Sequence, residues 1–301
     1  MSSDLQDLQA FLAVLQAQGF REAARSSNDS ASRLSEAVRR LEERLGVRLF
    51  NRTTRRVVAT EAGLRLAERL TPALAEVRAS LDVVNGYRER PAGRLRINVP
   101  ANVARTVLPP LVTPFLQRYP EIRLEVVVED SLVDVLAAGC DAGIRYDERL
   151  AQDMVAVPIG PRRQSLVTAA APAYLRKHGE PLHPAELLHH ACLRGRFAGG
   201  ALPVWEFEKD GEILRVDPDG PLQVRQAAAI DLAVQAAIDG LGIVHLFADW
   251  LRPHLDSGAL RPILEPWRQH FDGPWLYYPG RRQLPAPLRA FVDFVREQAV
   301  A

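Results

Sequence analysis

The chain has 301 residues, of which 47% are hydrophobic and 25% charged, so it is long enough for about two domains of ordinary size. No apolar run approaches the roughly 18 residues of a membrane helix, and the first residues lack the basic flank and apolar stretch of a secretory signal, so we expect a cytoplasmic protein with no membrane partner. Cys140 and Cys192 lie far apart, which excludes a disulfide framework and a zinc site visible in the sequence.

The net charge of +1 is divided unevenly along the chain. Residues 1–90 hold 15 Arg against 12 Asp and Glu, and within residues 33–56 there are 8 Arg against 3 Glu. A local excess of this kind is typical of a segment that binds a polyanion, although a solvated helix face with spare arginines is the simpler alternative.

Proline marks a boundary, because Pro72 is the only proline in residues 1–90. That first part can therefore be almost entirely helical. From Arg94 onward the pattern changes to short β-rich runs, such as 95–99 and 124–128, separated by helical stretches, as expected of an α/β sheet domain. Residues 86–93 are predicted to be the hinge between the two parts.

The first part begins with three predicted helices. Leucines recur at helical spacing in the first, at Leu5, Leu8, Leu12 and Leu15. A second, short helix is predicted over residues 21–26, and Ser30 is a good N-cap for a third. The buried stripe predicted for the third helix is Leu34, Val38, Leu41 and Leu45, and Gly46 is its expected C-cap.

The outward face of the third helix carries hydrogen-bonding and cationic side chains suited to a DNA major groove. Two short strands, predicted at 47–50 and 57–60, then flank an arginine-rich tip that can follow the phosphate backbone or enter a minor groove. This pattern predicts a winged helix-turn-helix. The candidate DNA-binding residues are Ser30, Ser32, Arg33, Ser35, Arg39, Arg40, Arg52, Thr53, Arg55 and Arg56.

The segments Ala23-Ala24, 30–35, 39–53 and Thr60-Glu61-Ala62-Gly63 resemble the LysR-type transcriptional regulators. The resemblance implies a fold that is α/β with an all-helical, winged N-terminal domain: a winged helix-turn-helix, a long linker helix, and a two-lobed effector domain like the type 2 periplasmic binding proteins. The implied partners are double-stranded DNA, a small-molecule effector and further copies of the chain. Ser27, Asp29 and Arg33 depart from the usual family residues, which concerns the stability and sequence preference of the recognition element.

The linker helix is predicted from a cap at Thr60 to about Val84. Its apolar residues alternate at spacings of 3 and 4, as in a heptad seam: Ala67, Leu70, Leu74, Val77, Leu81 and Val84. Pairing along this seam predicts a homodimer, or a homotetramer built from dimers, that reads an inverted repeat. The alternative is that the seam packs on its own domain, and Pro72 is expected to kink or divide the helix.

The remaining chain is expected to form the two effector lobes. The predicted domains are 1–60, 61–87 and 93–301, with lobe I at about 93–161 and 268–301 and lobe II at about 162–267. Ligands of open α/β sheets bind beyond the carboxyl ends of strands. By resemblance, the segments that carry Pro100, Ala101, Asn102, Ser131 and Gln226 line the effector cleft. Arg145 is a candidate for pairing with an acidic effector, and Arg194 and Phe197 are candidates for a charge and an apolar wall.

Other functions are weighed against this one. An enzyme would need a catalytic constellation, and His183, His189 and His190 have no partner carboxylates at ligand spacing, so we expect surface or capping histidines and no catalytic residue, metal or cofactor. A transport binding protein would share the second architecture but not the basic head. Two further alternatives stay open: a thiol redox sensor using the cysteines, and a small-molecule-binding dimer that has lost DNA binding.

Overall fold

The computed structural model describes residues 2–26, 29–52, 57–85, 91–129, 139–146, 154–197, 200–280 and 284–300. Contacts divide the chain into two compact units, the first reaching Val84 and the second beginning at Asn85. Buried hydrophobic clusters lie within each unit. Among the described helices, none has the length and apolar character needed to cross a membrane.

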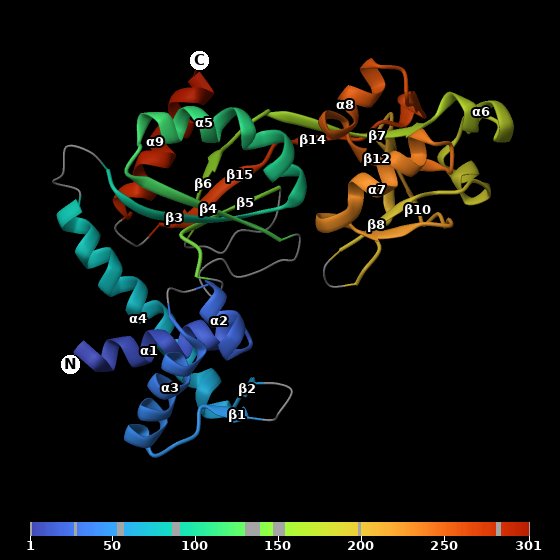
Figure 1. Cartoon of the computed structure of the whole chain (residues 1–301). Coiled ribbons are helices and arrows are strands. Elements are labelled where there is room, and N and C mark those ends of the chain that lie inside the picture. The colour runs from blue at the N-terminus through green and yellow to red at the C-terminus, as the bar shows by residue number, and fades with distance from the viewer. Residues whose placement is uncertain are drawn as a thin grey trace. The chain divides into compact units, whose positions relative to one another are not determined.

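The first unit is a helical head with a two-stranded wing and a long helix (Figure 1). Its elements are α1 (Ser2–Gln16), α2 (Phe20–Ser26), α3 (Ala31–Leu45), β1 (Phe50–Arg52), β2 (Val57–Ala59) and α4 (Glu61–Asn85). Strands β1 and β2 pair antiparallel, with Phe50 opposite Ala59. The first strand begins later than predicted, because the chain turns at Gly46 and Val47 remains exposed.

The core of the head uses a different face of α1 from the one predicted. Phe11 and Val14 are fully buried, whereas Leu5 is exposed and the other three leucines of the predicted stripe are only partly buried. Asp7 shares the buried face and is 2% exposed. The buried stripe of α1 therefore includes a charged residue and does not coincide with the leucine spacing of the sequence.

The third helix has the predicted ends. Ser30 caps it and Gly46 ends it with a left-handed φ of 66°, a conformation in which glycine carries no Cβ strain. Leu34, Val38 and Leu41 are buried as predicted, but Leu45 is 47% exposed, since the last turn extends past the head's core.

The long helix α4 runs unbroken from Glu61 to Asn85 through Pro72, so of the two effects predicted for this proline the division does not occur. The Thr60 hydroxyl accepts a hydrogen bond from the Gly63 amide at 3.1 Å, which confirms its capping role. Ala67 is buried in the head's core and Leu70 packs against it. Val77, further along the same seam, is 47% exposed. The first half of the seam therefore packs on its own domain, while Val77 lies free on the surface of this unit.

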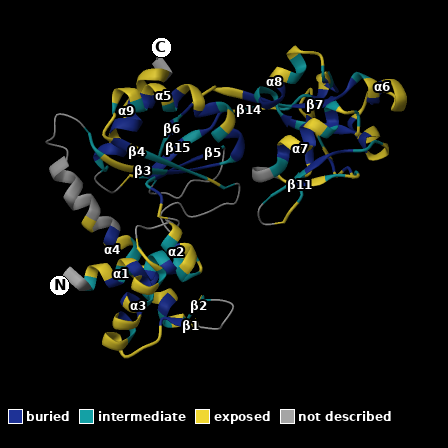
Figure 2. Ribbon diagram, in the orientation of Figure 1, coloured by how far each residue is buried: buried dark blue, intermediate teal, exposed yellow. Residues whose placement is uncertain are grey.

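The second unit contains two sheets. The first has the order β4-β3-β5-β15-β6, in which β3 is parallel to β4 and β5 and β15 is antiparallel to β5 and β6. The strands are β3 (Gly93–Val99), β4 (Ile122–Val128), β5 (Ala142–Arg145), β6 (Met154–Pro158) and β15 (Trp275–Pro279), and the helices packed with them are η1 (Val103–Val107), α5 (Pro109–Arg118) and α9 (Ala286–Val300). Figure 2 shows the strands largely buried and the outer faces of α5 and α9 exposed. Phe115 joins the two helices through its ring contacts with Phe291 and Phe294.

The second sheet has the order β12-β7-β13, with β14 also paired to β7. Its strands are β7 (Arg163–Ala170), β12 (Ile243–Phe247), β13 (Arg261–Ile263) and β14 (His270–Asp272), and a parallel pair β8 (Arg194–Arg196) and β11 (Gln223–Arg225) and a hairpin β9 (Trp205–Lys209) and β10 (Glu212–Val216) lie beside it. The helices of this lobe are α6 (Pro172–His178), η2 (Pro184–His189), α7 (Gln226–Ile238), α8 (Ala248–Asp256) and η3 (Glu265–Trp267). The second sheet thus extends to Asp272.

Two connecting segments join the sheets and hydrogen-bond to each other. The Gly273 amide donates to the Arg162 carbonyl at 2.9 Å, and the Ile159 amide donates to the Pro274 carbonyl at 3.0 Å. A β-carbon on Gly273 would overlap the carbonyl of Pro161, so this close crossing requires glycine. These hydrogen bonds join the two connecting segments to each other, so the lobes are linked by a pair of adjacent strands of chain.

Candidate nucleic-acid interface and effector site

The recognition helix α3 is positioned by its own cap. The Ser30 hydroxyl accepts a hydrogen bond from the Arg33 amide at 3.2 Å, which fixes where the helix begins. Ser32 and Arg33 are exposed on the first turns and Ser35 is half-buried. These side chains are on the part of the helix that enters the major groove in helix-turn-helix proteins.

Two of the predicted arginines lie beside exposed carboxylates that are three or four residues away in the sequence. Arg33 lies 3.6 Å from Asp29, and Arg39 donates to Glu36 at 2.9 Å. Asp29 is exposed, so its departure from an apolar residue carries no burial cost. Exposed pairs of this kind contribute little to stability. A DNA phosphate can therefore replace either carboxylate at low cost.

Arg40 has a different environment. Its guanidinium donates to Asp7 at 2.7 Å, and this hydrogen bond raises the pKa of Arg40. Because Asp7 is almost fully buried in α1, the pair joins the first and third helices. We infer that Arg40 mainly neutralises Asp7, and that Arg39 is the arginine more available to DNA.

The wing is tied to α3 by Glu42, which is not among the candidate residues predicted from the sequence. The Glu42 carboxylate accepts hydrogen bonds from the Leu49 amide at 2.8 Å and the Phe50 amide at 3.1 Å. Phe50 is also buried against Phe11, with ring centroids 5.3 Å apart. A glutamate seven residues before a buried apolar pair was the available signal, but its meaning depends on the turn after Gly46.

The predicted DNA contacts of the wing tip lie largely outside the described residues. The backbone of Arg52 is in β1, and its side chain is not described. Thr53, Arg55 and Arg56 fall between β1 and β2, outside the described part of the chain.

The carboxyl ends of β3 and β5 meet the start of β7 in a chain of hydrogen bonds. The side-chain amide of Asn102 donates to the Tyr146 hydroxyl, which donates in turn to Oε1 of Gln164 at 2.8 Å. Asn102 is 6% exposed and Gln164 is 7% exposed. We call this series of hydrogen bonds from Asn102 through Tyr146 to Gln164 the Asn102 chain. It joins elements of both lobes at the edge where ligands of α/β sheets bind.

Tyr146 also belongs to an aromatic cluster that connects the two lobes. Its ring lies 5.3 Å from that of Phe247 and 5.7 Å from that of Phe271, both in the second sheet. Burial raises the pKa of the Tyr146 phenol, so the hydroxyl stays protonated and remains a hydrogen-bond donor at neutral pH. Tyr146 was missed although it directly follows Arg145 at the end of a predicted strand.

Two side-chain amides, one at the end of the Asn102 chain and one beside Arg145, have buried nitrogen atoms. Within the described part of the protein, Nε2 of Gln164 and Nδ2 of Asn98 have no hydrogen-bond partner. A buried donor without an acceptor costs free energy, and a ligand oxygen would relieve that cost. The arrangement is therefore suited to a ligand that presents acceptor oxygens beside aromatic rings.

The candidate arginines of this domain are engaged within their own lobes. Arg145 is 4% exposed and donates to the Asn98 side chain and, at 2.8 Å, to the Ile144 carbonyl. Arg194 donates at 2.7 Å to the carbonyls of Pro218 and Pro203. These contacts stabilise β5 and the loops around the hairpin, and they place neither guanidinium on the Asn102 chain.

The other candidates divide between the lobe boundary and loops. Pro100 precedes the turn that carries Asn102, and Ala101 packs in the core cluster of the second lobe. Phe197 is half-buried, and its amide donates to the Ala201 carbonyl at 2.9 Å. Gln226 begins α7 with its side chain not described, and Ser131 lies outside the described residues.

A second contact between the lobes was not predicted. Arg105 of η1 forms an ion pair with Asp231 of α7, and its guanidinium lies 4.7 Å from the ring centroid of Trp250. The Trp250 indole donates to Asp231 at 3.1 Å. We call these three residues the interlobe clasp.

The cysteines and histidines have structural surroundings. Cys140 and Cys192 are buried and form no disulfide with each other, and burial raises the pKa of the Cys192 thiol to about 12. Such a thiol is almost entirely protonated at neutral pH, which disfavours redox sensing. The His183 ring accepts from the Ala185 amide at 3.2 Å and caps η2, as expected. Among the described residues no group of three His, Cys, Asp or Glu could hold a metal ion.

A winged helix-turn-helix head followed by a long helix and a two-lobed α/β domain defines a class, the DNA-binding regulators that carry a separate ligand-sensing domain. Residues 5–64 match the bacterial regulatory helix-turn-helix proteins of the lysR family, and residues 88–300 match the LysR substrate binding domain. The chain belongs to the LysR family of transcriptional regulators.

Similar proteins cover nearly the whole chain. It is 39% identical over 296 residues to the uncharacterized HTH-type transcriptional regulator YcaN of Escherichia coli, covering 98% of this chain and 96% of that one. The solved full-length virulence activator AphB of Vibrio cholerae is 26% identical with a TM-score of 0.69, covering 97% and 98% of the two chains. CrgA of Neisseria meningitidis is 29% identical with a TM-score of 0.58, again covering 97% and 98%.

Proposed function

We propose that this regulator binds an inverted-repeat promoter site as a homodimer or a homotetramer, and that a small-molecule effector held between the lobes changes its occupancy of that site. The proposed division is a DNA-binding domain at 1–60, a linker helix at 61–87 and an effector domain at 93–301. We propose no catalytic role, since the chain belongs to a family of transcriptional regulators.

The head supports the DNA part of the proposal. The proposed contacts lie on α3 and the wing: Ser32, Arg33, Ser35, Arg39, Arg52, Thr53, Arg55 and Arg56. Ser30 and Arg40 support these residues through the cap and the Asp7 pair. Exposed Val77 on α4 supports pairing of two copies, which would place two recognition helices at a fixed spacing.

The observation that carries the effector part is the buried nitrogen of Gln164 at the end of the Asn102 and Tyr146 chain. An effector with an acceptor oxygen would satisfy this donor and lie against the aromatic cluster. Because the chain bridges both lobes, an effector that binds one lobe arrangement better shifts the population toward it. That shift would change the relative placement of paired heads.

The test of DNA binding uses the full-length protein and the DNA upstream of its own gene. We expect salt-dependent binding, and each of Arg39→Ala and Arg55→Ala should lower the salt slope by about 1 because each arginine displaces a counterion. Arg118→Ala, which removes the same charge from α5, is the control. Retention of wild-type slopes in both head variants would reject these contacts, and binding of ligand without retardation of any duplex would favour a regulator that has lost DNA binding.

The test of the effector site compares Asn102→Ala with wild type in a thermal-shift screen of small carboxylates and carbonyl compounds. A compound that stabilises the wild type and changes its promoter occupancy should lose both effects in the variant. DNA affinity without the compound should stay within about threefold. A variant that responds normally would remove Asn102 from the site.

A further inference from the structure

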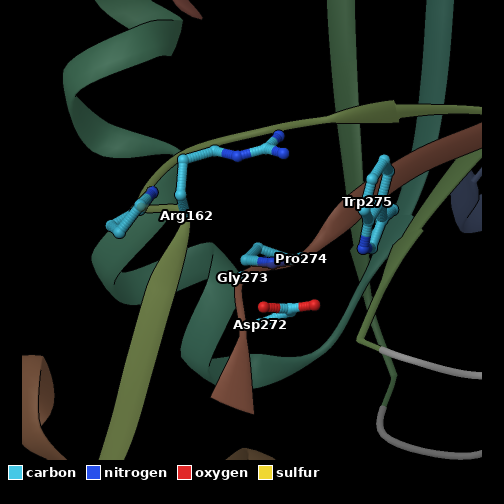
Figure 3. Close-up of a pocket in the computed structure, with 6 residues that line it drawn as sticks. Arg162, Asp272, Gly273, Pro274 and Trp275 are labelled. Atoms are coloured by element: carbon cyan, nitrogen blue, oxygen red, sulfur yellow. The ribbon is translucent and has the colours of Figure 1, made fainter. Parts of the chain in front are cut away.

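A pocket of about 260 Å³ lies where the two connecting segments cross between the lobes, apart from the Asn102 chain. Its lining comes from Pro161 and Arg162 on one segment and from Asp272, Gly273, Pro274 and Trp275 on the other. Figure 3 shows Arg162 reaching toward Trp275 across the Gly273–Pro274 segment, with the Asp272 carboxylate on the other side of that segment in this view. The volume lies near the lower limit for small-molecule sites, roughly 300–1,000 Å³, so it suits a small ligand.

The pocket is lined by one positive side chain, Arg162, and one negative side chain, Asp272, that are not paired with described residues. Arg162 and Asp272 are both exposed, and neither forms an ion pair or a side-chain hydrogen bond with any described residue. Most other arginines of this lobe are engaged, for example Arg194 with Asp217 and Arg215 with Glu206. Two opposite charges that line one pocket without pairing are available to a ligand.

The ring of Trp275 lies beside the positive charge of Arg162. The Arg162 guanidinium lies 5.4 Å from the ring centroid of Trp275, within the range of a cation–π contact. Stacking leaves the edge of the guanidinium free for a carboxylate, which it can bind through two parallel hydrogen bonds. The half-buried Trp275 ring also offers an apolar surface to the ligand.

The two charges together select the ligand's chemistry. A simple anion would be attracted by Arg162 and repelled by Asp272, and a simple cation would meet the reverse. A molecule that carries both a carboxylate and an ammonium group satisfies both. We propose that this pocket binds a free α-amino acid, with its carboxylate on Arg162, its ammonium group on Asp272 and its side chain against Trp275.

The location gives such binding a consequence for regulation. Arg162 precedes by two residues Gln164, which ends the hydrogen-bonded chain between the lobes. The Gly273 amide donates to the carbonyl of Arg162, so both crossing segments form the pocket wall. An amino acid bound here contacts both segments and favours the lobe arrangement in which the two charged groups are correctly spaced.

The experiment is a thermal-shift screen of the full-length protein with the twenty standard L-amino acids, followed by calorimetric titration of the best one. We expect saturable binding. Its N-acetyl and carboxamide derivatives, which each lack one charge, should bind at least about tenfold more weakly. Arg162→Gln should abolish the preference over the carboxamide, and Asp272→Asn the preference over the N-acetyl form.

Both variants change exposed side chains, so they should fold, and unchanged far-UV circular dichroism checks this. Absence of binding by every amino acid, or equal binding of the free and blocked forms, would overturn the proposal. Binding that is lost in Asn102→Ala but kept in Arg162→Gln would place the amino acid between the lobes and would also overturn it. Neither result bears on DNA binding, which is measured separately.

Discussion

At the scale of single residues, the head places a carboxylate in its core. Asp7 is 2% exposed and receives a hydrogen bond from Arg40 at 2.7 Å. A buried carboxylate that loses its partner retains the cost of desolvation. We therefore expect Arg40→Ala to lower the melting temperature of the head clearly, whereas Arg39→Ala, which breaks only exposed pairs, should leave it unchanged. Differential scanning calorimetry of both variants checks this, and equal melting temperatures would contradict it.

His245 gives a prediction about pH. Burial lowers the pKa of His245 to about 3, and its Nδ1 lies 2.8 Å from the Thr168 hydroxyl. The folded protein holds this ring neutral, while the unfolded chain binds a proton below its ordinary pKa of about 6.5. The stabilisation is therefore complete above about pH 6.5 and is lost as pH falls toward 3, by at most about 1.4 kcal/mol per pH unit.

The check is urea unfolding between pH 7 and pH 5. His245→Asn keeps a polar group near Thr168 but has no proton to bind, so its free energy of unfolding should fall less steeply over this range. Identical slopes for the variant and the wild type would show that other groups account for the pH dependence.

At the scale of elements, local signals predicted most helices and strands. Ser30, Gly46 and Thr60 act at helix ends as expected, because caps depend on neighbours within four residues. The buried face of α1 could not be predicted, since Asp7 is compatible with the core only through Arg40, 33 residues later. In the same way Asn102 was found at the end of its strand, but its partners Tyr146 and Gln164 come from distant strands.

The linker helix carries a prediction about assembly. Its seam is buried in the head at Ala67, while Val77 is 47% exposed. If Val77 is the contact between copies, Val77→Asp should raise the dimer dissociation constant at least about tenfold, because it brings a charge into an apolar seam. Leu64→Asp makes the same change at another exposed apolar residue of α4, about 140° around the helix from Val77, and is the control. Sedimentation velocity that shows the same assembly for both variants would exclude this surface.

At the scale of the whole effector domain, the interlobe clasp bears on how the lobes move. Arg105→Ala removes the pair with Asp231 and the contact with Trp250. Since the pair is partly exposed, its loss should be modest, and we expect amide hydrogen exchange in η1 and at the start of α7 to accelerate by about two- to fivefold. Arg118→Ala breaks a comparable pair with Glu297 inside the first lobe and should leave those amides unchanged. No change in the Arg105 variant would mean that the clasp does not hold the lobes.

The strand order has a consequence for synthesis. Strand β15 lies between β5 and β6 in the first sheet, yet it leaves the ribosome after every strand of the second sheet. Helix α9, whose Phe291 and Phe294 contact Phe115, emerges later still. The nascent chain can therefore complete the head and the second lobe while the first lobe still lacks the strand that joins β5 to β6, so translation that stalls before Trp275 leaves an open, aggregation-prone sheet.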